Sequence, residues 1–210
     1  MELVKLTTKL SILVQGLSLF PTIRGVVKPV TPEKRLLRDT LRVELAVTLV
    51  QLTFYLILLH KFNLAKMAVT RYYDWFITTP TMLFSMASYF TYVQNPHMTI
   101  REIIQKYKTP LVQIFIANFF MLLAGYMAEV GVIDRKVAFV LGFAAFAIAF
   151  GTLKKQFVTD KSKNIFNTLA TVWGLYGVAF MLPDVEKNVM YNGLDIISKN
   201  FFAVFLSYSL

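Results

Sequence analysis

The chain has 210 residues, of which 56% are hydrophobic, 15% aromatic and 16% charged. Soluble domains carry about 25% charged residues, so this composition predicts a membrane protein and excludes an ordinary soluble domain. Cysteine is absent, which excludes disulfides and thiolate metal sites, and the two histidines, His60 and His97, stand isolated at the ends of predicted segments. We therefore expect no metal site. We also expect a protein that is not an enzyme.

Seven segments approach the roughly 20 mostly apolar residues that a membrane-spanning helix requires. In chain order they are residues 4–26, 39–60, 68–93, 109–130, 135–157, 164–182 and 187–209. No internal repeat or separate soluble region accompanies them. The sequence therefore predicts an all-α membrane protein, in which residues 1–210 form one seven-helix transmembrane domain.

The segments differ in polarity and in how they are connected. Segment 4–26 is the weakest candidate, because it carries Thr7, Thr8, Lys9, Ser11 and Gln15. It lacks the ordered basic, apolar and cleavage regions of a signal peptide. We expect it to be kept as the first helix. Residues 99–108 are amphipathic, and they either lie at the membrane interface or begin the next helix. Gly131 and Asp134 predict a tight turn before the fifth segment.

Lysine and arginine are more numerous on one side of the predicted bundle, with thirteen residues against eight. Cytoplasmic loops carry the excess of these residues. We therefore predict an N-terminus outside and a C-terminus in the cytoplasm, in the membrane of a cell or host cell. These loops also explain the net charge of +10, so nucleic acid is not an expected partner.

Ionisable residues inside the third and last segments indicate a functional site. Arg71 and Asp74 begin the third apolar run, and Asp195 and Lys199 share one face of the last segment. Such a residue costs about 2.5–3.5 kcal/mol at a helix centre, so it usually faces a partner inside the bundle. The predicted topology puts both aspartates on the outer side of Lys199, where they flank its amine. A lysine there serves as an ion-pair partner, a proton relay or the site of a Schiff base with a carbonyl cofactor.

The patterns Asp195-x-x-x-Lys199 and Arg71-Tyr-x-Asp74-Trp75-x-x-Thr78-Thr79-Pro80 together resemble the microbial (type I) rhodopsins, over essentially the whole chain. The resemblance implies all-trans retinal bound covalently to Lys199 as a protonated Schiff base. Asp74 and Asp195 are then its counterions, Arg71 lies outward of them, and Tyr55 bonds a counterion. The expected retinal pocket is apolar and aromatic. Its candidates are Trp75, Thr78, Thr79, Met82, Met121, Gly125, Phe139, Gly142, Phe146, Trp173, Tyr176 and Phe180.

Several positions depart from the pattern of this family. Ser85 stands where proton-pumping members have the carboxylate that reprotonates the Schiff base, and a serine is a poor proton donor. Lys187 stands where their outer release group has a glutamate, although acidic residues beside it can substitute. Gly177 replaces a common proline, and Phe180 replaces a usual tryptophan.

Polar residues of the first two segments predict an ion pathway. Glu44 lies near the depth of Ser85, and Ser11 and Gln15 share one face of the first helix. These groups can hydrate a path that continues outward. The predicted pathway residues are Ser11, Gln15, Glu44, Arg71, Ser85 and Asn192. The alternatives are hydrogen bonding between helices for Ser11 and Gln15, and a displaced proton donor for Glu44.

This residue set, with the short chain and loops, most resembles the giant-virus group I rhodopsins, which are viral channelrhodopsins. That resemblance implies a light-gated cation channel. The alternatives are a light-driven outward proton pump and a sensory photoreceptor that signals through a partner protein. Expected partners are the lipid bilayer, the transported cations or protons, and a second copy in a homo-oligomer.

Overall fold

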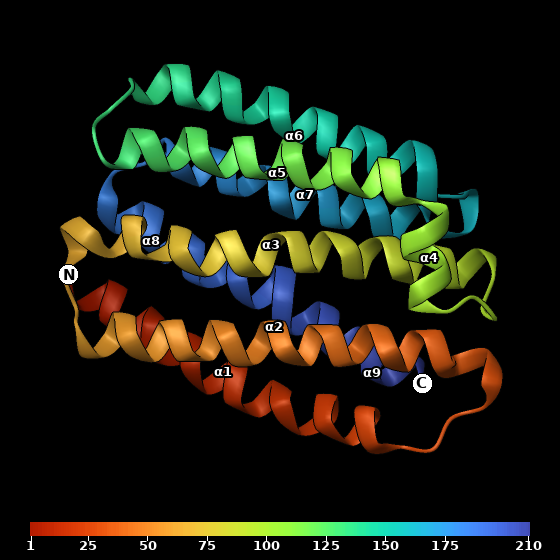
Figure 1. Cartoon of the computed structure of the whole chain (residues 1–210). Coiled ribbons are helices and arrows are strands. Elements are labelled where there is room, and N and C mark those ends of the chain that lie inside the picture. The colour runs from red at the N-terminus through yellow and green to blue at the C-terminus, as the bar shows by residue number, and fades with distance from the viewer.

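The structure is a computed structural model that describes residues 1–210, and it contains only helices and their connections. The helices are α1 (Glu2–Val27), η1 (Pro32–Lys34), α2 (Arg35–His60), α3 (Leu64–Gln94), α4 (Ile100–Lys106), α5 (Lys108–Glu129), α6 (Arg135–Phe157), η2 (Asp160–Ser162), α7 (Lys163–Phe180), α8 (Asp184–Asp195), η3 (Ile196–Phe201) and α9 (Phe202–Ser209). The long ones run side by side in a bundle (Figure 1). Each of the first six predicted segments corresponds to one long helix, and the seventh corresponds to α8, η3 and α9 in succession.

Four helical segments are long and apolar enough to cross a membrane by length and composition alone. They are Glu2–Val27, Pro32–His60, Lys108–Glu129 and Arg135–Phe157. The helix α3, the helix α7 and the segment made of α8, η3 and α9 do not meet this criterion of length and hydropathy. Two of them, α3 and α8, carry the charged residues of the site, which lowers their mean hydropathy.

The first helix is apolar on its outer face and polar on its inner face. Leu6, Leu13 and Phe20 are exposed, whereas Thr8 and Ser11 are fully buried. Buried residues recur along α1 every three or four positions, and five of the seven are polar. A soluble helix buries its apolar stripe, so this reversed pattern is that of a helix facing lipid.

Local signals explain where several helices begin. Asp134 accepts hydrogen bonds from the backbone N–H groups of Lys136 and Val137, at 2.8 and 3.3 Å, and so caps α6. Gly131 has a φ of +79°, a left-handed conformation that makes the tight turn before α6 possible. Thr99 and Glu102 form a capping box at α4, and the Thr99 backbone N–H lowers the pKa of Glu102. Residues 99–108 thus contain a separate short helix.

One regular helix over residues 187–209 was the prediction, and it is wrong in two respects. The helix begins earlier, at Asp184, and it is interrupted by a π-helical turn, Ile196–Phe201, that carries Lys199. A π-turn inserts an extra residue into the helical ladder and commonly marks functional sites. Hydropathy does not reveal it, because hydropathy reports how apolar a segment is and not which hydrogen-bond ladder its backbone adopts.

Candidate functional site: a buried lysine between two aspartates

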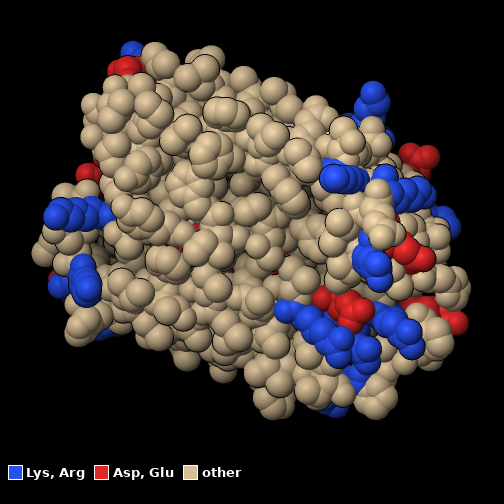
Figure 2. Space-filling model, in the orientation of Figure 1, with Lys and Arg blue, Asp and Glu red and all other residues tan.

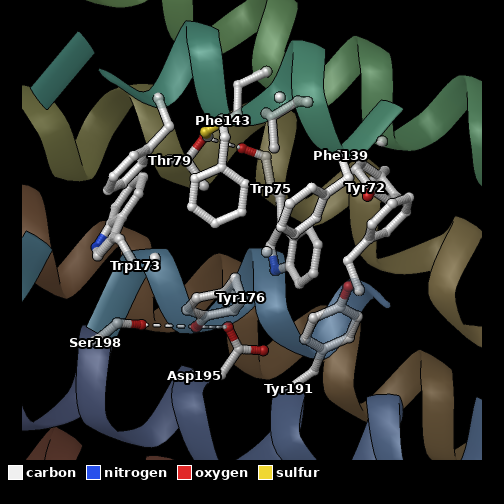
Figure 3. Close-up of a pocket in the computed structure, with 18 of the residues that line it drawn as sticks. Tyr72, Trp75, Thr79, Phe139, Phe143, Trp173, Tyr176, Tyr191, Asp195 and Ser198 are labelled. Carbon is white, nitrogen blue, oxygen red and sulfur yellow. Dashed lines mark hydrogen bonds between the residues drawn. The ribbon is translucent and has the colours of Figure 1, made fainter. Parts of the chain in front are cut away.

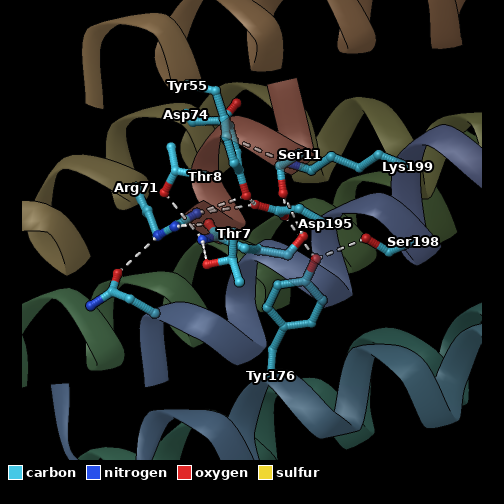
Figure 4. A network of polar contacts seen from close by, with 12 residues as sticks. Thr7, Thr8, Ser11, Tyr55, Arg71, Asp74, Tyr176, Asp195, Ser198 and Lys199 are labelled. Atoms are coloured by element: carbon cyan, nitrogen blue, oxygen red, sulfur yellow. Dashed lines mark hydrogen bonds and ion pairs between the residues drawn. The ribbon is translucent and has the colours of Figure 1, made fainter. Parts of the chain in front are cut away.

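The Lys199 amine lies between two carboxylates inside the bundle. Its Nζ is 3.0 Å from Asp74 Oδ2 and 3.4 Å from Asp195 Oδ1. All three side chains are at most 3% exposed. Figure 4 shows the two aspartates converging on the lysine from α3 and α8. The structure therefore brings together the three residues expected to flank one another.

Asp195 has several partners besides the lysine. Its Oδ2 accepts hydrogen bonds from Tyr55 OH at 2.6 Å and from Arg71 Nη1 at 3.3 Å. Its Oδ1 accepts from Tyr176 OH at 2.8 Å, and that hydroxyl is also 2.8 Å from Ser198 Oγ. Asp74 is bonded only by Lys199 among side chains, and its Oδ1 is buried without a partner. The charge of Asp195 is thus shared, and that of Asp74 is directed at Lys199.

Arg71 connects this site to the end of the bundle that holds the N-terminus (Figure 1). Its Nη1 donates to Tyr55 OH at 2.9 Å, its Nε donates to Asn188 Oδ1 at 3.1 Å, and its Nη2 donates to Asn192 Oδ1. The Asn192 amide in turn donates to Thr7 Oγ1 at 2.8 Å on α1. The guanidinium is therefore held by one carboxylate and by neutral groups, as a buried cation requires.

An apolar pocket extends from Lys199 between α3, α5, α6 and α7 (Figure 3). Eleven of the twelve predicted pocket residues line it. They are Trp75, Thr79, Met82, Met121, Gly125, Phe139, Gly142, Phe146, Trp173, Tyr176 and Phe180. Thr78 does not line it, and its hydroxyl donates to the backbone carbonyl of Asp74, at 3.0 Å. A hydroxyl four residues on along a helix commonly makes this bond.

Asp195 and Lys199, predicted as the Schiff-base residues, also line the pocket. The lining residues that the sequence analysis did not assign to the pocket are Tyr72, Leu122, Ala138, Phe143, Gly174, Gly177, Tyr191 and Ser198. Tyr191 had an available signal, because it lies four residues before Asp195 on the same helix face. Gly125 has a packing role, since a Cβ there would lie 2.9 Å from Cζ of the Tyr72 ring. A larger residue at position 125 would displace Tyr72 from the pocket wall.

The predicted pathway residues fall into two groups. Toward the end of the bundle that holds the N-terminus, Ser11 Oγ donates to the backbone carbonyl of Asn192 at 3.1 Å, beside Arg71. Toward the opposite end, the carboxyl oxygens of Glu44 are buried without a hydrogen-bond partner, and Ser85 faces this carboxyl from α3. Both amide atoms of Gln15 are also buried and unpartnered. The structure thus places Glu44 with Ser85, as the depth argument expected, and leaves these groups unsatisfied by protein.

The side-chain amides of Gln51 and Asn200 add to the unpartnered polar groups around Glu44. Gln51 on α2 has no partner for either amide atom, and Asn200 Oδ1 is likewise unpartnered. Asn200 Nδ2 donates to Ser18 Oγ at 3.0 Å. Buried polar groups are normally hydrogen-bonded, and a set of unpartnered groups marks a place where water or an ion completes the bonding. Asn200 directly follows Lys199 in the sequence, but its hydrogen bond is made to Ser18 on α1, which is far away in the sequence.

Comparisons with known proteins identify the family and the fold. A family model described as bacteriorhodopsin-like protein matches residues 4–210. The structure is similar to that of viral rhodopsin OLPVRII, with 25% identity and a TM-score of 0.88, over 99% of this chain and 97% of that one. A viral rhodopsin is thus among the similar structures, in line with the resemblance. Comparison with curated protein sequences finds no match.

More distant structures share the fold. The light-driven proton pump LR (Mac) from Leptosphaeria maculans is 15% identical with a TM-score of 0.78, over 100% of this chain and 96% of that one. Bromide-bound halorhodopsin from Halobacterium salinarum is 16% identical with a TM-score of 0.75, over 99% and 93%. At these identities the likeness concerns the fold alone.

Proposed function

Because the chain belongs to the family of bacteriorhodopsin-like proteins, we propose that it is a retinal protein in which light, absorbed at Lys199, opens a passive path for cations. Residues 1–210 form the single domain that does this. The observation that carries the retinal assignment is the Lys199 amine, which lies between two carboxylates at the wall of an aromatic pocket.

The pocket residues fit an apolar carbonyl cofactor. The wall is mostly hydrophobic, and the Lys199 amine is one of few charged groups that line it. Asp74 Oδ1 is buried beside that amine without a hydrogen-bond partner, so an acceptor is available there. When bound, all-trans retinal would supply an aldehyde that condenses with the Lys199 amine, with loss of water, and a polyene that light isomerises.

The protein's own residues have distinct tasks at this site. Asp74 and Asp195 stabilise a proton and its positive charge at Nζ of Lys199. Tyr55 and Tyr176 orient Asp195, and Arg71 keeps its charge balanced from the outer side. The aromatic wall excludes water, which strengthens these electrostatic interactions. A movement of the proton at Nζ away from Asp74 would disturb the network that reaches Asn192.

The channel proposal rests on the unpartnered polar groups between α1, α2, α3 and η3. Glu44, Gln15 and Ser85 are buried there with no hydrogen-bond partner, and Ser11, Asn192 and Arg71 continue outward. Water and a cation would satisfy these groups. Ser85 supplies no readily available proton for a pump cycle. Both points favour passive conduction, as in the viral channelrhodopsins of group I.

The orientation in the membrane follows from the charged surface. Lysine and arginine gather at the end of the bundle that holds α4 and the C-terminus (Figure 2). We propose that this end faces the cytoplasm of a cell or host cell and that the N-terminus lies outside. The lipid-facing helices also offer surfaces on which copies can assemble into a homo-oligomer.

An outward proton pump is the second candidate, because Glu44 faces Ser85 and can act as a displaced proton donor. Voltage clamp under shifted proton and cation gradients separates the two. A passive channel is expected to give a photocurrent that reverses sign at a potential following the cation gradient. A photocurrent that stays outward across the voltage range would overturn the channel and support the pump. A light-dependent interaction with a partner protein, without photocurrent, would support a sensory receptor.

Replacing Glu44 with glutamine is expected to reduce the photocurrent about tenfold, equivalent to a barrier higher by about 1.4 kcal/mol, because the path loses its buried carboxyl group. The absorption maximum should stay nearly unchanged, since Glu44 does not line the pocket. Asp39→Asn is the matched control, because Asp39 is an acidic residue of α2 paired with Arg42 at 2.7 Å near the surface. A large colour change in Glu44→Gln would instead place its carboxyl near the chromophore.

A further inference from the structure

On two helices, α5 and α8, pocket-lining residues are spaced four apart. On each helix a charged residue stands at the next position of this four-residue spacing. On α5 the pocket residues Met121 and Gly125 are followed one turn later by Glu129. On α8 the pocket residues Asp195 and Tyr191 are preceded one turn earlier by Lys187. Residues four apart lie on one helix face, so both charges point in the direction of the pocket wall.

These two charges meet. Lys187 Nζ lies 2.8 Å from Glu129 Oε1 and 2.9 Å from Glu129 Oε2, so the carboxylate is bonded through both oxygens. Asp184 Oδ1 is also 2.9 Å from this amine. The Lys187 side chain is 0% exposed and that of Glu129 is 7% exposed, whereas Asp184 is 52% exposed. The cluster thus extends from the protein interior to the surface.

The position of each charge is unfavourable on its own. Glu129 is the last residue of α5, and Lys187 lies in the first turn of α8. Helix C-termini disfavour anions and N-termini disfavour cations. Burial adds a further cost to each charge unless it is paired. The pair is therefore stable only because α5 and α8 are held together at this point.

The cluster lies at the outer end of the pocket. Tyr72 and Tyr191 stand together at one end in Figure 3, with Trp173 and Ser198 at the other. Lys187 is one turn outward of Tyr191, and two turns, about 12 Å, outward of Asp195. On the other side of this end, the Arg135 guanidinium lies 5.6 Å from the centre of the Phe180 ring. Charged groups thus surround the aromatic wall where it approaches water.

We propose that Lys187, Glu129 and Asp184 form an ionic clasp that closes the outer end of the chromophore pocket against water and small hydrophilic nucleophiles. Lys187 acts as a positioning residue, since it holds α8 against α5 and touches none of the reacting atoms. The clasp also explains why a lysine occupies the position where pumping relatives have a glutamate. This inference rests on the proposed retinal site.

The test is the rate at which hydroxylamine bleaches the retinal-loaded protein in the dark, since this reagent must reach the bond to Lys199. Lys187→Met leaves Glu129 buried without a cation. We expect bleaching about tenfold faster than in the parent, which corresponds to about 1.4 kcal/mol less free energy for opening the pocket. Glu129→Gln should also bleach faster, by a smaller factor, because Lys187 keeps Asp184. Lys187→Arg should restore the parent rate.

Lys5→Met is the matched control, because Lys5 pairs with Glu2 at 3.4 Å in an exposed ion pair. It should bleach at the parent rate. Parent-like rates in both Lys187→Met and Glu129→Gln would overturn the clasp, and if Lys187→Met does not fold, Glu129→Gln alone decides. A parent protein that takes up no retinal would contradict the proposed function instead, so the two failures are distinguishable.

Discussion

Replacing Lys199 with alanine is expected to give a protein that stays colourless with retinal. No other amine lines the pocket, so no other lysine can form the Schiff base there. Absorption spectra of the purified protein with added retinal measure the effect. In the parent, borohydride reduction followed by peptide mass analysis should find the adduct on Lys199. A coloured, covalently labelled Lys199→Ala protein would refute the site.

The same substitution is also expected to destabilise the fold. Asp74 has no other cation, so removing Lys199 leaves a buried carboxylate unpaired, at a cost of about 3–5 kcal/mol. Asp195 keeps Arg71 at 3.3 Å. The double variant Lys199→Ala/Asp74→Asn removes both charges and should recover most of this stability in a denaturation assay. It therefore separates loss of colour from loss of fold.

Neutralising Asp74 is expected to shift the absorption maximum to longer wavelength. Asp74 is the nearer carboxylate, and its bonding is directed at Lys199, so Asp74→Asn removes the main anion that stabilises the positive ground state. A neighbouring anion favours the protonated, positively charged form of a nitrogen base such as the Schiff base on Lys199. Without it the proton leaves more easily, and the visible band should be lost at a pH lower by about two units, or 2.7 kcal/mol.

Spectra recorded across a pH titration measure both effects. Asp39→Asn, at the surface of α2, is the control and should leave the colour and the titration unchanged. If Asp74→Asn leaves both unchanged, then Asp195 is the dominant counterion. That outcome would contradict the structure, in which two tyrosines and Arg71 share the charge of Asp195.

The helices and the main site were predictable because their signals are local. Long apolar segments and caps depend on residues close in sequence, and the four-residue spacing of Asp195 and Lys199 puts both on one face. The motif around Asp74 added the family, which the match over residues 4–210 confirms. Even here the regular spacing concealed the π-turn at Lys199, since a change of helical register leaves hydropathy unaltered.

Pairings between helices were not predictable from single segments. Arg71 donates to Asn188 across the bundle, and Thr78 does not line the pocket although its neighbour Thr79 does. Asn200 joins the polar groups of α1 through Ser18. Which of several polar groups on a face finds which partner depends on the rotation and depth of each helix, and these are set by packing among all helices.

The sequence by itself determined that this is a helical membrane protein with a buried lysine, two aspartates and an arginine in the pattern of a rhodopsin. Only the tertiary structure decided that Asp74 is bonded to the lysine alone, while Asp195 shares its charge with Tyr55, Tyr176 and Arg71. It also decided that Lys187, a departure from the family pattern, meets Glu129 of another helix. The physical reason is range: helix formation depends on bonds between residues four apart, whereas charge balance depends on side chains that folding brings together from distant helices.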